Sequence, residues 1–438
     1  MRVLLTSEAR FERTPDGTIW APAAYGRALW SRYLDVFSAV LVAARVSTVQ
    51  EASSGSVEAS TSGVRFCPLP PYAGLSGLVQ HLAAVRGSIA GALRTSPAVI
   101  VRAPSPLAYL TGRAAAGAGR PFAAEIVGDP DQVFSPGAFR HPLRLPIRCL
   151  AAAAQRRLSR NAIAVLYVTR DALQRRYPTR GSVHAASDVA LDDLSFAARP
   201  CREWSPPASF VLVTVGALDQ PYKGTGVLLD AVSQLRGRGL PVRLRIVGDG
   251  RLLPDLERRC EELGASGDVE FLGRQDREGV RSALDSAHLF VLPSLTEGLP
   301  RALVEAMARG LPAVATDVGG IPELLPTECL VPPRQPRALA DRIEQLMKDE
   351  AGRRRLGASN RSRALEYHER TQADVRRTFL RVVRDASRTV PQFAVRCSQF
   401  AARGPGAEQI IVEHDAETGR RLKYYSRAAD AGYWTGKW

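Results

Sequence analysis

Lysine and long apolar runs are scarce in this sequence. Only four of its 59 basic residues are lysine, namely Lys223, Lys348, Lys423 and Lys437. No stretch reaches the roughly 18 to 20 consecutive apolar residues that a membrane-spanning helix needs. The opening segment MRVLLTSEAR carries acidic and basic residues too early for a signal peptide. The sequence therefore predicts a cytoplasmic protein without a membrane span.

The cysteines also lack the spacing of a metal site. There are six of them and none forms a C-x-x-C pair, so the sequence indicates neither a zinc site nor a disulfide framework. We expect reduced, structural cysteines, no bound metal and no cofactor. No repeat of fixed period is present, which argues against a solenoid or propeller.

The charge balance is strongly positive. Hydrophobic residues make up 45% and charged residues 24% of the chain, which is typical of a soluble globular protein, and the formal net charge is +15. Such a charge favours an anionic partner, which could be nucleic acid, a phosphate-bearing substrate or an anionic membrane surface. Arginine richness can equally reflect a GC-rich genome.

The chain is organised as two α/β domains. Its 438 residues suit two domains of roughly 200 residues. Short β-branched runs alternate with helical patterns, which predicts βαβ units and parallel sheets. We place the domains at 1–195 and 210–370, joined by the Pro- and Ser-rich linker 195–209, with a cleft between them. Residues 53–63 are predicted to form an exposed loop. Helices are predicted over 336–348 and 351–387; the part from 371 to 388 could cross back to the first domain. The sequence of the tail 389–438 does not indicate a function.

Two acidic residues stand out in the stretch SLTEGLPRALVEAMARG, residues 294–310. Glu297 follows the buried-strand pattern LFVLPS, at the end of a strand where open α/β sheets bind ligands. Pro300 suits a first helical turn and Gly310 a left-handed stop, so a helix is predicted over 300–309.

The second acid, Glu305, projects away from the apolar face formed by Leu303, Met307 and Leu311, and so faces the cleft or solvent. The helix N-terminus beside Glu297 can bind an anion or sugar hydroxyls. The alternative is structural: Glu305 pairs with Arg301 and Glu297 is a solvated loop acid.

The continuous segment EGLPRALVEAMARGLPAVATDVGGIPELL resembles the E-x7-E signature of the family-4 retaining glycosyltransferases, which have the GT-B fold of two Rossmann-like domains facing across a cleft. The resemblance continues through VTVGALDQPYKGTGVLLDAV, RLRIVGDG, VEFLGR and TDVGGIPE. It implies that Glu297 lies beside the donor sugar and that Glu305 binds ribose hydroxyls. Gly298, Leu299 and Pro300 occupy the positions that cradle sugar and phosphate.

The lysine at 223 is the expected phosphate ligand. Gly216 ends a strand, and Lys223 follows in the next loop. Negative charge grows on the β-phosphate of a departing nucleoside diphosphate, and a fixed cation there lowers the barrier. The family commonly has arginine directly after the glycine, whereas this chain has Ala217, so Arg274 or Arg301 would have to substitute. The alternative is an exposed loop lysine.

Two other motifs carry weaker predictions. IVGDG resembles the start of a dinucleotide fingerprint, but Leu253 stands where its third glycine belongs, so nicotinamide binding is not predicted. GDPD contains a D-x-D, and the resemblance makes Asp129 a candidate acceptor-side residue. The alternative is a turn-forming aspartate.

The segment 139–160 is basic and amphipathic. It either lies on an anionic membrane surface or is a solvated helix over the first-domain core. Nucleic acid is not a predicted partner, because no aromatic stacking platform accompanies the arginines.

The resemblance implies a metal-independent, retaining glycosyltransferase. Its predicted partners are a nucleotide-diphosphate sugar donor and a glycan or lipid-linked acceptor, and it would work in the cytoplasm or at the inner face of the membrane. The alternative function is a non-catalytic nucleotide-sugar-binding homologue.

Overall fold

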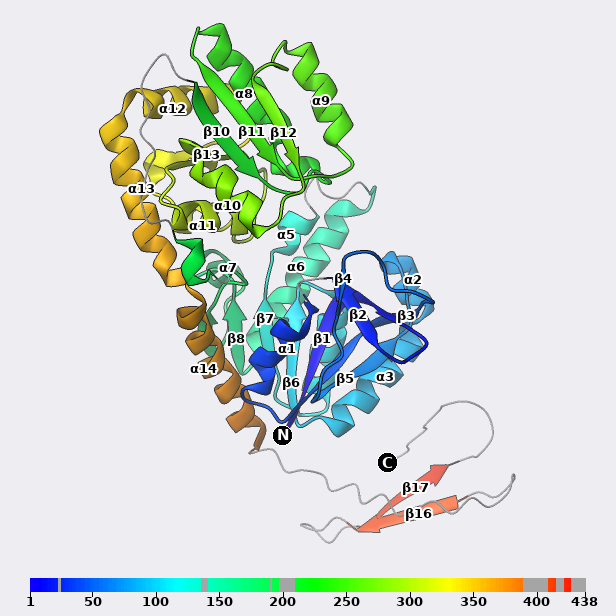
Figure 1. The fold of residues 1–438 in the computed structure, drawn as a ribbon. Coiled ribbons are helices and arrows are strands. Elements are labelled where there is room, and N and C mark those ends of the chain that lie inside the picture. Colours follow the sequence, from blue (N-terminus) through cyan, green and yellow to red (C-terminus); the bar gives the residue numbers. More distant parts are fainter. Residues whose placement is uncertain are drawn as a thin grey trace. The chain divides into compact units, whose positions relative to one another are not determined.

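A computed structural model describes residues 1–22, 25–134, 141–189, 191–196, 209–388, 409–414 and 421–426. Two parallel sheets, each covered by helices, dominate the structure (Figure 1). Strands alternate with helices along both domains, and the predicted α/β class is confirmed. The predicted linker lies outside the described residues over 197–208.

The first sheet belongs to the first domain and has nine strands. Its parallel part has the order β5-β3-β1-β6-β7-β8-β9, and β2 pairs antiparallel with the end of β1 and with β4. The strands are β1 (Arg2–Arg13), β2 (Ile19–Pro22), β3 (Ala39–Thr48), β4 (Ser56–Glu58), β5 (Val64–Leu69), β6 (Ala98–Ala103), β7 (Ala123–Ile126), β8 (Ala164–Tyr167) and β9 (Ser182–Ala185). The loop predicted over 53–63 therefore contains the edge strand β4. A strand of three half-buried residues is too short to show an alternating pattern.

Apolar residues cover both faces of this sheet. On β1, Leu4 joins one buried cluster while Val3 and Leu5 join the other, as the two-residue period of a strand requires. The helices of this domain are α1 (Arg27–Leu34), α2 (Gly74–Gln80), α3 (Leu82–Thr95), α4 (Pro106–Gly117), α5 (Pro130–Val133), α6 (Arg144–Asn161) and α7 (Ala172–Arg176).

The second sheet is parallel throughout and has the order β12-β11-β10-β13-β14-β15. The strands are β10 (Phe210–Val215), β11 (Val242–Val247), β12 (Val269–Gly273), β13 (Leu289–Leu292), β14 (Ala313–Thr316) and β15 (Leu330–Val331). The helices are α8 (Thr225–Gly237), α9 (Leu253–Glu262), α10 (Arg277–Asp285), α11 (Arg301–Ala308), α12 (Pro336–Lys348) and α13 (Glu350–Ala364). The strand order reverses between β10 and β13, and this switch point is where doubly wound sheets bind ligands.

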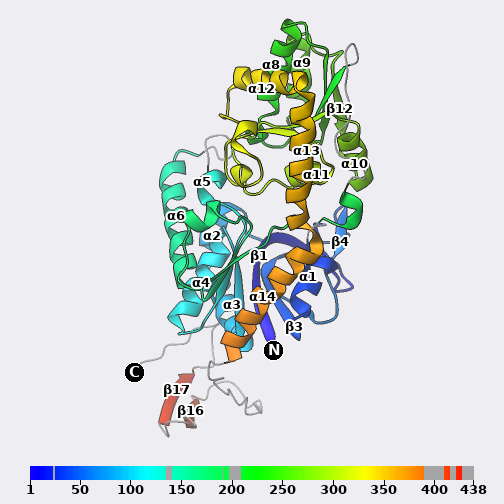
Figure 2. The ribbon, with the colours of Figure 1, turned by 90° about the vertical axis from the view of Figure 1, so that its left-hand side faces the viewer.

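The prediction of one continuous helix over 351–387 is wrong, because this segment forms two helices separated by a turn. After α13 come a short 3-10 turn at Leu365–Tyr367 and a new helix, α14 (Glu369–Arg388). At the break, Glu369 N donates to Leu191 O (2.8 Å). Backbone pairing with the segment that leaves the first domain therefore replaces a helical hydrogen bond. Helix α14 then packs on the first sheet through Phe379, Leu380 and Val383 (Figure 2).

Few residues of the tail are described. Strands β16 (Gln409–His414) and β17 (Arg421–Ser426) pair antiparallel as a hairpin, which the sequence analysis did not predict. Across the described residues, no helix combines the length and apolar character that crossing a membrane requires.

Candidate functional site: a lysine and a glutamate at the switch point

The loops after β10 and β13 carry the predicted site residues. The β10 loop closes in a 3-10 turn, Pro221–Lys223, before α8 begins at Thr225. The β13 loop runs from Pro293 to Pro300. Leu295 N donates to Tyr222 O (2.7 Å), which fixes one loop against the other. A Cβ at Gly216 would lie 3.8 Å from Lys223 Cδ, so the strand end and the lysine stem are in contact distance.

Lys223 and Glu297 form an ion pair at this point. Lys223 Nζ lies 2.8 Å from Glu297 Oε1, and the Ser294 hydroxyl donates to the same oxygen at 2.8 Å. Glu297 is 9% exposed. Within the described residues, Glu297 Oε2 accepts no hydrogen bond. Lys223 Nζ has Glu297 as its hydrogen-bond partner there and also lies 5.4 Å from the centroid of the Tyr222 ring. The pair therefore keeps an acceptor oxygen and ammonium N–H groups available to a ligand.

The loop of Glu297 is held by backbone contacts from the segment after β14. Gly320 N donates to Gly298 O (2.8 Å), and the Thr316 hydroxyl donates to Ser294 O. Gly319 has φ +57°, and a Cβ there would lie 1.7 Å from Glu297 O. Only glycine allows this approach. The TDVGGIPE segment thus sets the position of the acid.

Helix α11 follows the prediction closely. It spans Arg301–Ala308, with Pro300 as its N-cap residue and no side-chain cap, and Gly310 has φ +69°. The left-handed stop is confirmed. Leu303 and Met307 are buried on the core side. Leu299, which precedes Pro300, is half-buried and packs against the same core.

Glu305 lies on the other side of α11 and lines a cavity of 630 Å³ together with Arg301. Burial raises the pKa of the Glu305 carboxyl, against the lowering effect of Arg301 and Arg277. The described residues contain no Arg301–Glu305 ion pair, which disfavours the purely structural alternative for this acid. Neither Glu297 nor Lys223 lines this cavity. The two acids therefore border different spaces.

The residues proposed to replace the missing arginine do not join the pair. Ala217 is exposed. Arg274 is exposed and makes no hydrogen bond or ion pair with a described residue, and Arg301 faces the Glu305 cavity. No contact of Arg274 or Arg301 with Lys223 is seen in the part of the chain that the structure describes. Their role as substitutes for that arginine stays a prediction.

The Asp129 carboxylate forms hydrogen bonds within the first domain. It is 2% exposed and caps α5 by accepting from Asp131 N (2.9 Å). Its carboxylate also accepts from Arg176 Nη1 (2.6 Å) and from the Tyr177 hydroxyl. The same guanidinium bonds Asp131, and Arg148 Nε lies 3.8 Å from Asp131 Oδ1, so both acids of the D-x-D are paired with arginine. These contacts favour the turn-forming alternative, because both carboxylate oxygens of Asp129 already accept hydrogen bonds. An acceptor-side role for Asp129 stays a prediction.

The glycines of IVGDG have a structural explanation. Gly248 has φ +144°, and a Cβ there would lie 1.9 Å from Gly216 O. This glycine lets the β11 loop pass against the β10 loop, so its presence needs no dinucleotide.

Several neighbours of the site were missed from the sequence. Ser294 orients Glu297, and its place three residues before the acid was the available signal. The Thr296 hydroxyl is buried and has no hydrogen-bond partner among the described residues. From the first domain, Val127 O would lie 3.7 Å from a Cβ at Gly298, a contact that only the fold reveals.

Comparisons with known proteins agree with this geometry. Protein CapJ of Staphylococcus aureus is 24% identical over 339 residues, covering 76% of this chain and 83% of CapJ. The amylovoran biosynthesis glycosyltransferase AmsK of Erwinia amylovora is 36% identical over 169 residues, covering 33% of this chain. The chain spans 40% of the length of AmsK in that match.

Solved structures show the same architecture. HepE of Anabaena, in a crystal structure with UDP and glucose, superposes with a TM-score of 0.59 at 18% identity, covering 89% of this chain and 100% of HepE. The sequence model of the family Glycosyl transferases group 1 matches residues 209–349, which contain the Lys223–Glu297 pair and Glu305. Residues 209–349 therefore resemble the group 1 glycosyltransferases, and the chain shares the GT-B fold of these structures.

Proposed function

We propose that this protein is a retaining glycosyltransferase that moves a sugar from a nucleoside-diphosphate donor to an acceptor hydroxyl in cell-envelope or exopolysaccharide glycan synthesis. The Lys223–Glu297 pair at the β10/β13 switch point carries the proposal, because it combines a cation with an unused carboxylate oxygen. The similarity to AmsK, an amylovoran biosynthesis glycosyltransferase, supports the reaction class, and the UDP and glucose bound to HepE support the donor class.

Each half of the pair has a distinct task in this proposal. The Lys223 ammonium faces negative charge that develops on the β-phosphate, and Glu297 Oε2 accepts from donor-sugar hydroxyls. Ser294 and Lys223 hold Oε1, so the carboxylate is oriented before the donor binds. The N-terminus of α11 has no side-chain cap, which leaves the backbone N–H groups near Gly298 and Leu299 for sugar and phosphate oxygens. Glu305 would bind the ribose.

The bond changes follow from retention. The bond from the sugar C1 to the β-phosphate oxygen breaks, and a bond from C1 to the acceptor oxygen forms on the same face. The acceptor proton passes to the departing diphosphate, so no protein nucleophile is required. Lys223 supplies the cationic stabilisation, and we propose that transfer proceeds without a metal ion.

The first domain would bind the acceptor, close to a membrane. One face of α6 packs in the core through Ala152 and Leu158. Leu150 lies away from that face and is 72% exposed, and Leu143 and Leu145 are exposed where the helix begins. Apolar side chains among arginines are the pattern of a helix that lies on an anionic surface. A lipid-linked acceptor would be presented there.

Donor binding and turnover test the proposal. UDP-, GDP- and ADP-sugars are screened by thermal shift, and a donor at 100 times its Kd should stabilise the fold by about 2.7 kcal/mol. Transfer is then followed with labelled donor and a membrane extract. Loss of a charged hydrogen bond in Glu297→Gln should lower turnover at least about tenfold. Glu257→Gln, a solvent-exposed glutamate of α9, is the matched control. Proton NMR of the product reports the anomeric configuration, and transfer in excess EDTA tests metal independence.

The second candidate is a non-catalytic nucleotide-sugar-binding homologue, favoured by Ala217 at the position of the usual arginine. Such a protein would bind a nucleotide sugar with full stabilisation and neither transfer nor hydrolyse it. Unchanged thermal stabilisation with no turnover above the Glu297→Gln background would select this candidate.

A further inference from the structure

Arginines from three helices line the 630 Å³ cavity that contains Glu305. Arg277 and Arg281 stand one turn apart on α10, and Arg301 lies one turn before Glu305 on α11. Residues four apart share a helix face, so each helix turns one side toward the cavity. Arg32 of α1 contributes from the first domain.

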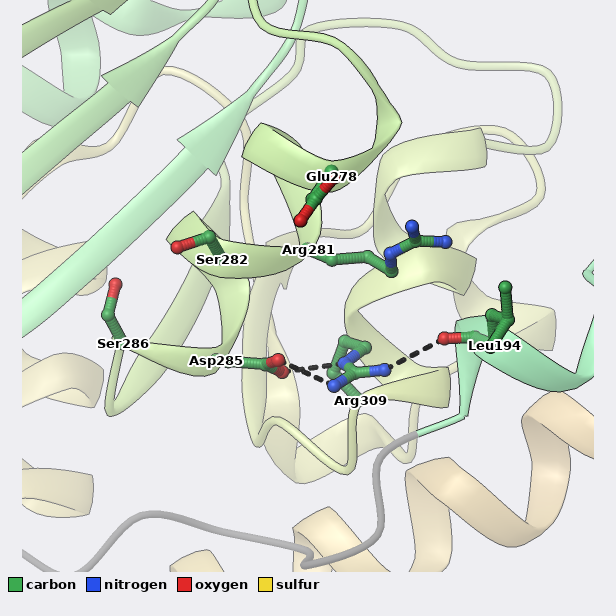
Figure 3. A pocket seen from close by; sticks show the side chains of 7 residues that line it. All are labelled: Leu194, Glu278, Arg281, Ser282, Asp285, Ser286 and Arg309. Carbon is green, nitrogen blue, oxygen red and sulfur yellow. Dashed lines mark hydrogen bonds and ion pairs between the residues drawn. The ribbon is translucent and has the colours of Figure 1, made fainter.

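Some arginines of this cavity have structural partners. Arg102 bonds Glu125 Oε2 (3.0 Å) and Asp188. Arg309 bonds Asp285 Oδ1 (2.6 Å) and donates to the carbonyl of Leu194, as Figure 3 shows for an adjoining pocket of 590 Å³. These side chains fix the walls.

The other arginines of the cavity have no hydrogen-bonded partner in the part of the chain that the structure describes. Arg32, Arg277, Arg281 and Arg301 make no hydrogen bond or ion pair with any described residue. In Figure 3 the Arg281 side chain extends into the pocket near Arg309 and no dashed line reaches it. Arg32 and Arg281 are half-buried. Burying their charges costs desolvation free energy, and no hydrogen bond to a described residue offsets that cost.

The acids that line the cavity offset only part of this charge. The Asp276 carboxylate accepts from Gly279 N (2.8 Å) as the cap of α10. The Ser195 hydroxyl holds Asp192 and lowers its pKa, with a smaller contribution from Arg281. Burial raises the pKa of Glu305. Burial, together with nearby Arg32, lowers the pKa of Arg376 to about 10. A carboxylate that accepts a hydrogen bond keeps its negative charge, so these acids offset part of the positive charge. The cavity stays cationic because Arg32, Arg277, Arg281 and Arg301 outnumber Asp192, Asp276 and Glu305. Like charges one turn apart on α10 also weigh against the helix.

We propose that this cavity binds an anionic group of the acceptor, a carboxylate or a phosphate, between Arg32 of the first domain and Arg277 and Arg281 of the second. The inference rests on the proposed function, in which Lys223 serves the donor diphosphate. Glu305 borders the same cavity and binds the donor ribose in that proposal, so the acceptor anion is assigned to the arginines of the cavity and not to Glu305. Acceptors without a negative charge would be poor substrates.

Calorimetry on the full chain with saturating UDP tests the subsite. The probes are methyl β-D-glucuronide for a carboxylate, glucose 6-phosphate for a phosphate, and methyl β-D-glucoside as the neutral comparison. A charged probe should bind at least tenfold tighter than the neutral one, and less tightly at high salt. The double variant Arg32→Gln/Arg281→Gln should lose about tenfold in that affinity and leave UDP affinity within twofold. The control is Arg86→Gln/Arg337→Gln, which alters two exposed helical arginines away from the cavity.

Each outcome decides the inference. Equal binding of charged and neutral probes overturns it, as does a charged probe that displaces UDP or a double variant that loses UDP instead, because the arginines would then hold the nucleotide. If the wild-type chain binds no nucleotide, the proposed function fails separately. The charged probes are then titrated alone, and a loss in the double variant still supports the anion subsite.

Discussion

The Glu323 carboxylate of the second domain accepts a hydrogen bond from the backbone N–H of Arg170 in the first domain (2.7 Å). It also accepts from Asp171 N and Ala172 N, at the start of α7. Arg170 Nη1 in turn lies 2.5 Å from Glu366 Oε2. One carboxylate of the TDVGGIPE segment thus satisfies three backbone donors across the two domains, and the same segment positions Glu297.

Replacing this carboxylate should loosen the contact between the domains. In Glu323→Ala the three N–H groups lose a charged acceptor, and because the site is partly solvated we expect a loss of about 1–2 kcal/mol. Calorimetry should show Tm lowered by about 2 °C or more. Donor affinity should fall as well. Glu328→Ala is the control, since its surface pair with Arg355 should be worth less than about 1 kcal/mol. Equal Tm values for the two variants would contradict the assignment.

Lys223 should act mainly on the chemical step. Lys223→Met keeps the length of the side chain and removes its charge, so kcat should fall by about 10²- to 10³-fold. Lys348→Met is the control, because Lys348 is an exposed helical lysine that also bonds a glutamate. Initial rates with labelled donor measure both. A Lys223→Met rate within threefold of the wild type would remove the lysine from the mechanism.

Local signals explain why much of the site could be predicted from the sequence. Glu297 follows a strand of four buried residues. The carboxyl end of such a strand at a switch point lies where open α/β sheets bind ligands. Gly310 ends α11 because a left-handed residue is needed there. Lys223 precedes a glycine that opens α8. Each of these positions depends on neighbours within a few residues.

The rest of the fold and the site could not be predicted, because it depends on contacts between residues that are far apart in the sequence. Glu323 meets Arg170 only because two domains are folded, and nothing near either residue in the sequence indicates it. Asp129 was proposed for the acceptor side from a family resemblance, and its partners Arg176 and Tyr177 gave no local signal because they lie 47 and 48 residues away in the sequence. The break between α13 and α14 has the same origin, since pairing of Leu191 with Glu369 overrides a continuous helical pattern.

The Glu305 carboxyl should make stability depend on pH. Burial raises its pKa in the folded state above the unfolded value, so the folded state binds the proton more tightly. Below the unfolded pKa both states are protonated and no effect remains. As pH rises through the folded pKa, the buried charge destabilises the fold.

Glu305→Gln removes that charge, and the variant should gain stability relative to wild type as pH rises from 4 to 7. Urea unfolding at both pH values measures the difference, with Glu257→Gln as a control whose effect should not change with pH. Nucleotide affinity at pH 7 should fall about tenfold if Glu305 binds ribose hydroxyls. A stability difference that is the same at both pH values would contradict the role of burial.

Gly319 should be the least replaceable residue near the site. A Cβ there would lie 1.7 Å from Glu297 O, and its φ of +57° is strained for any other residue. Gly319→Ala must therefore push the Glu297 loop away, and we expect a stability loss of about 2–4 kcal/mol. Gly239 has φ +77° and open space around its Cβ position, so Gly239→Ala isolates the backbone strain, about 1 kcal/mol. Donor binding by calorimetry separates the two further, because displacing Glu297 should weaken the donor in Gly319→Ala alone. Equal stability losses with intact donor binding in both variants would mean that the loop tolerates the displacement and that Gly319 does not position the acid.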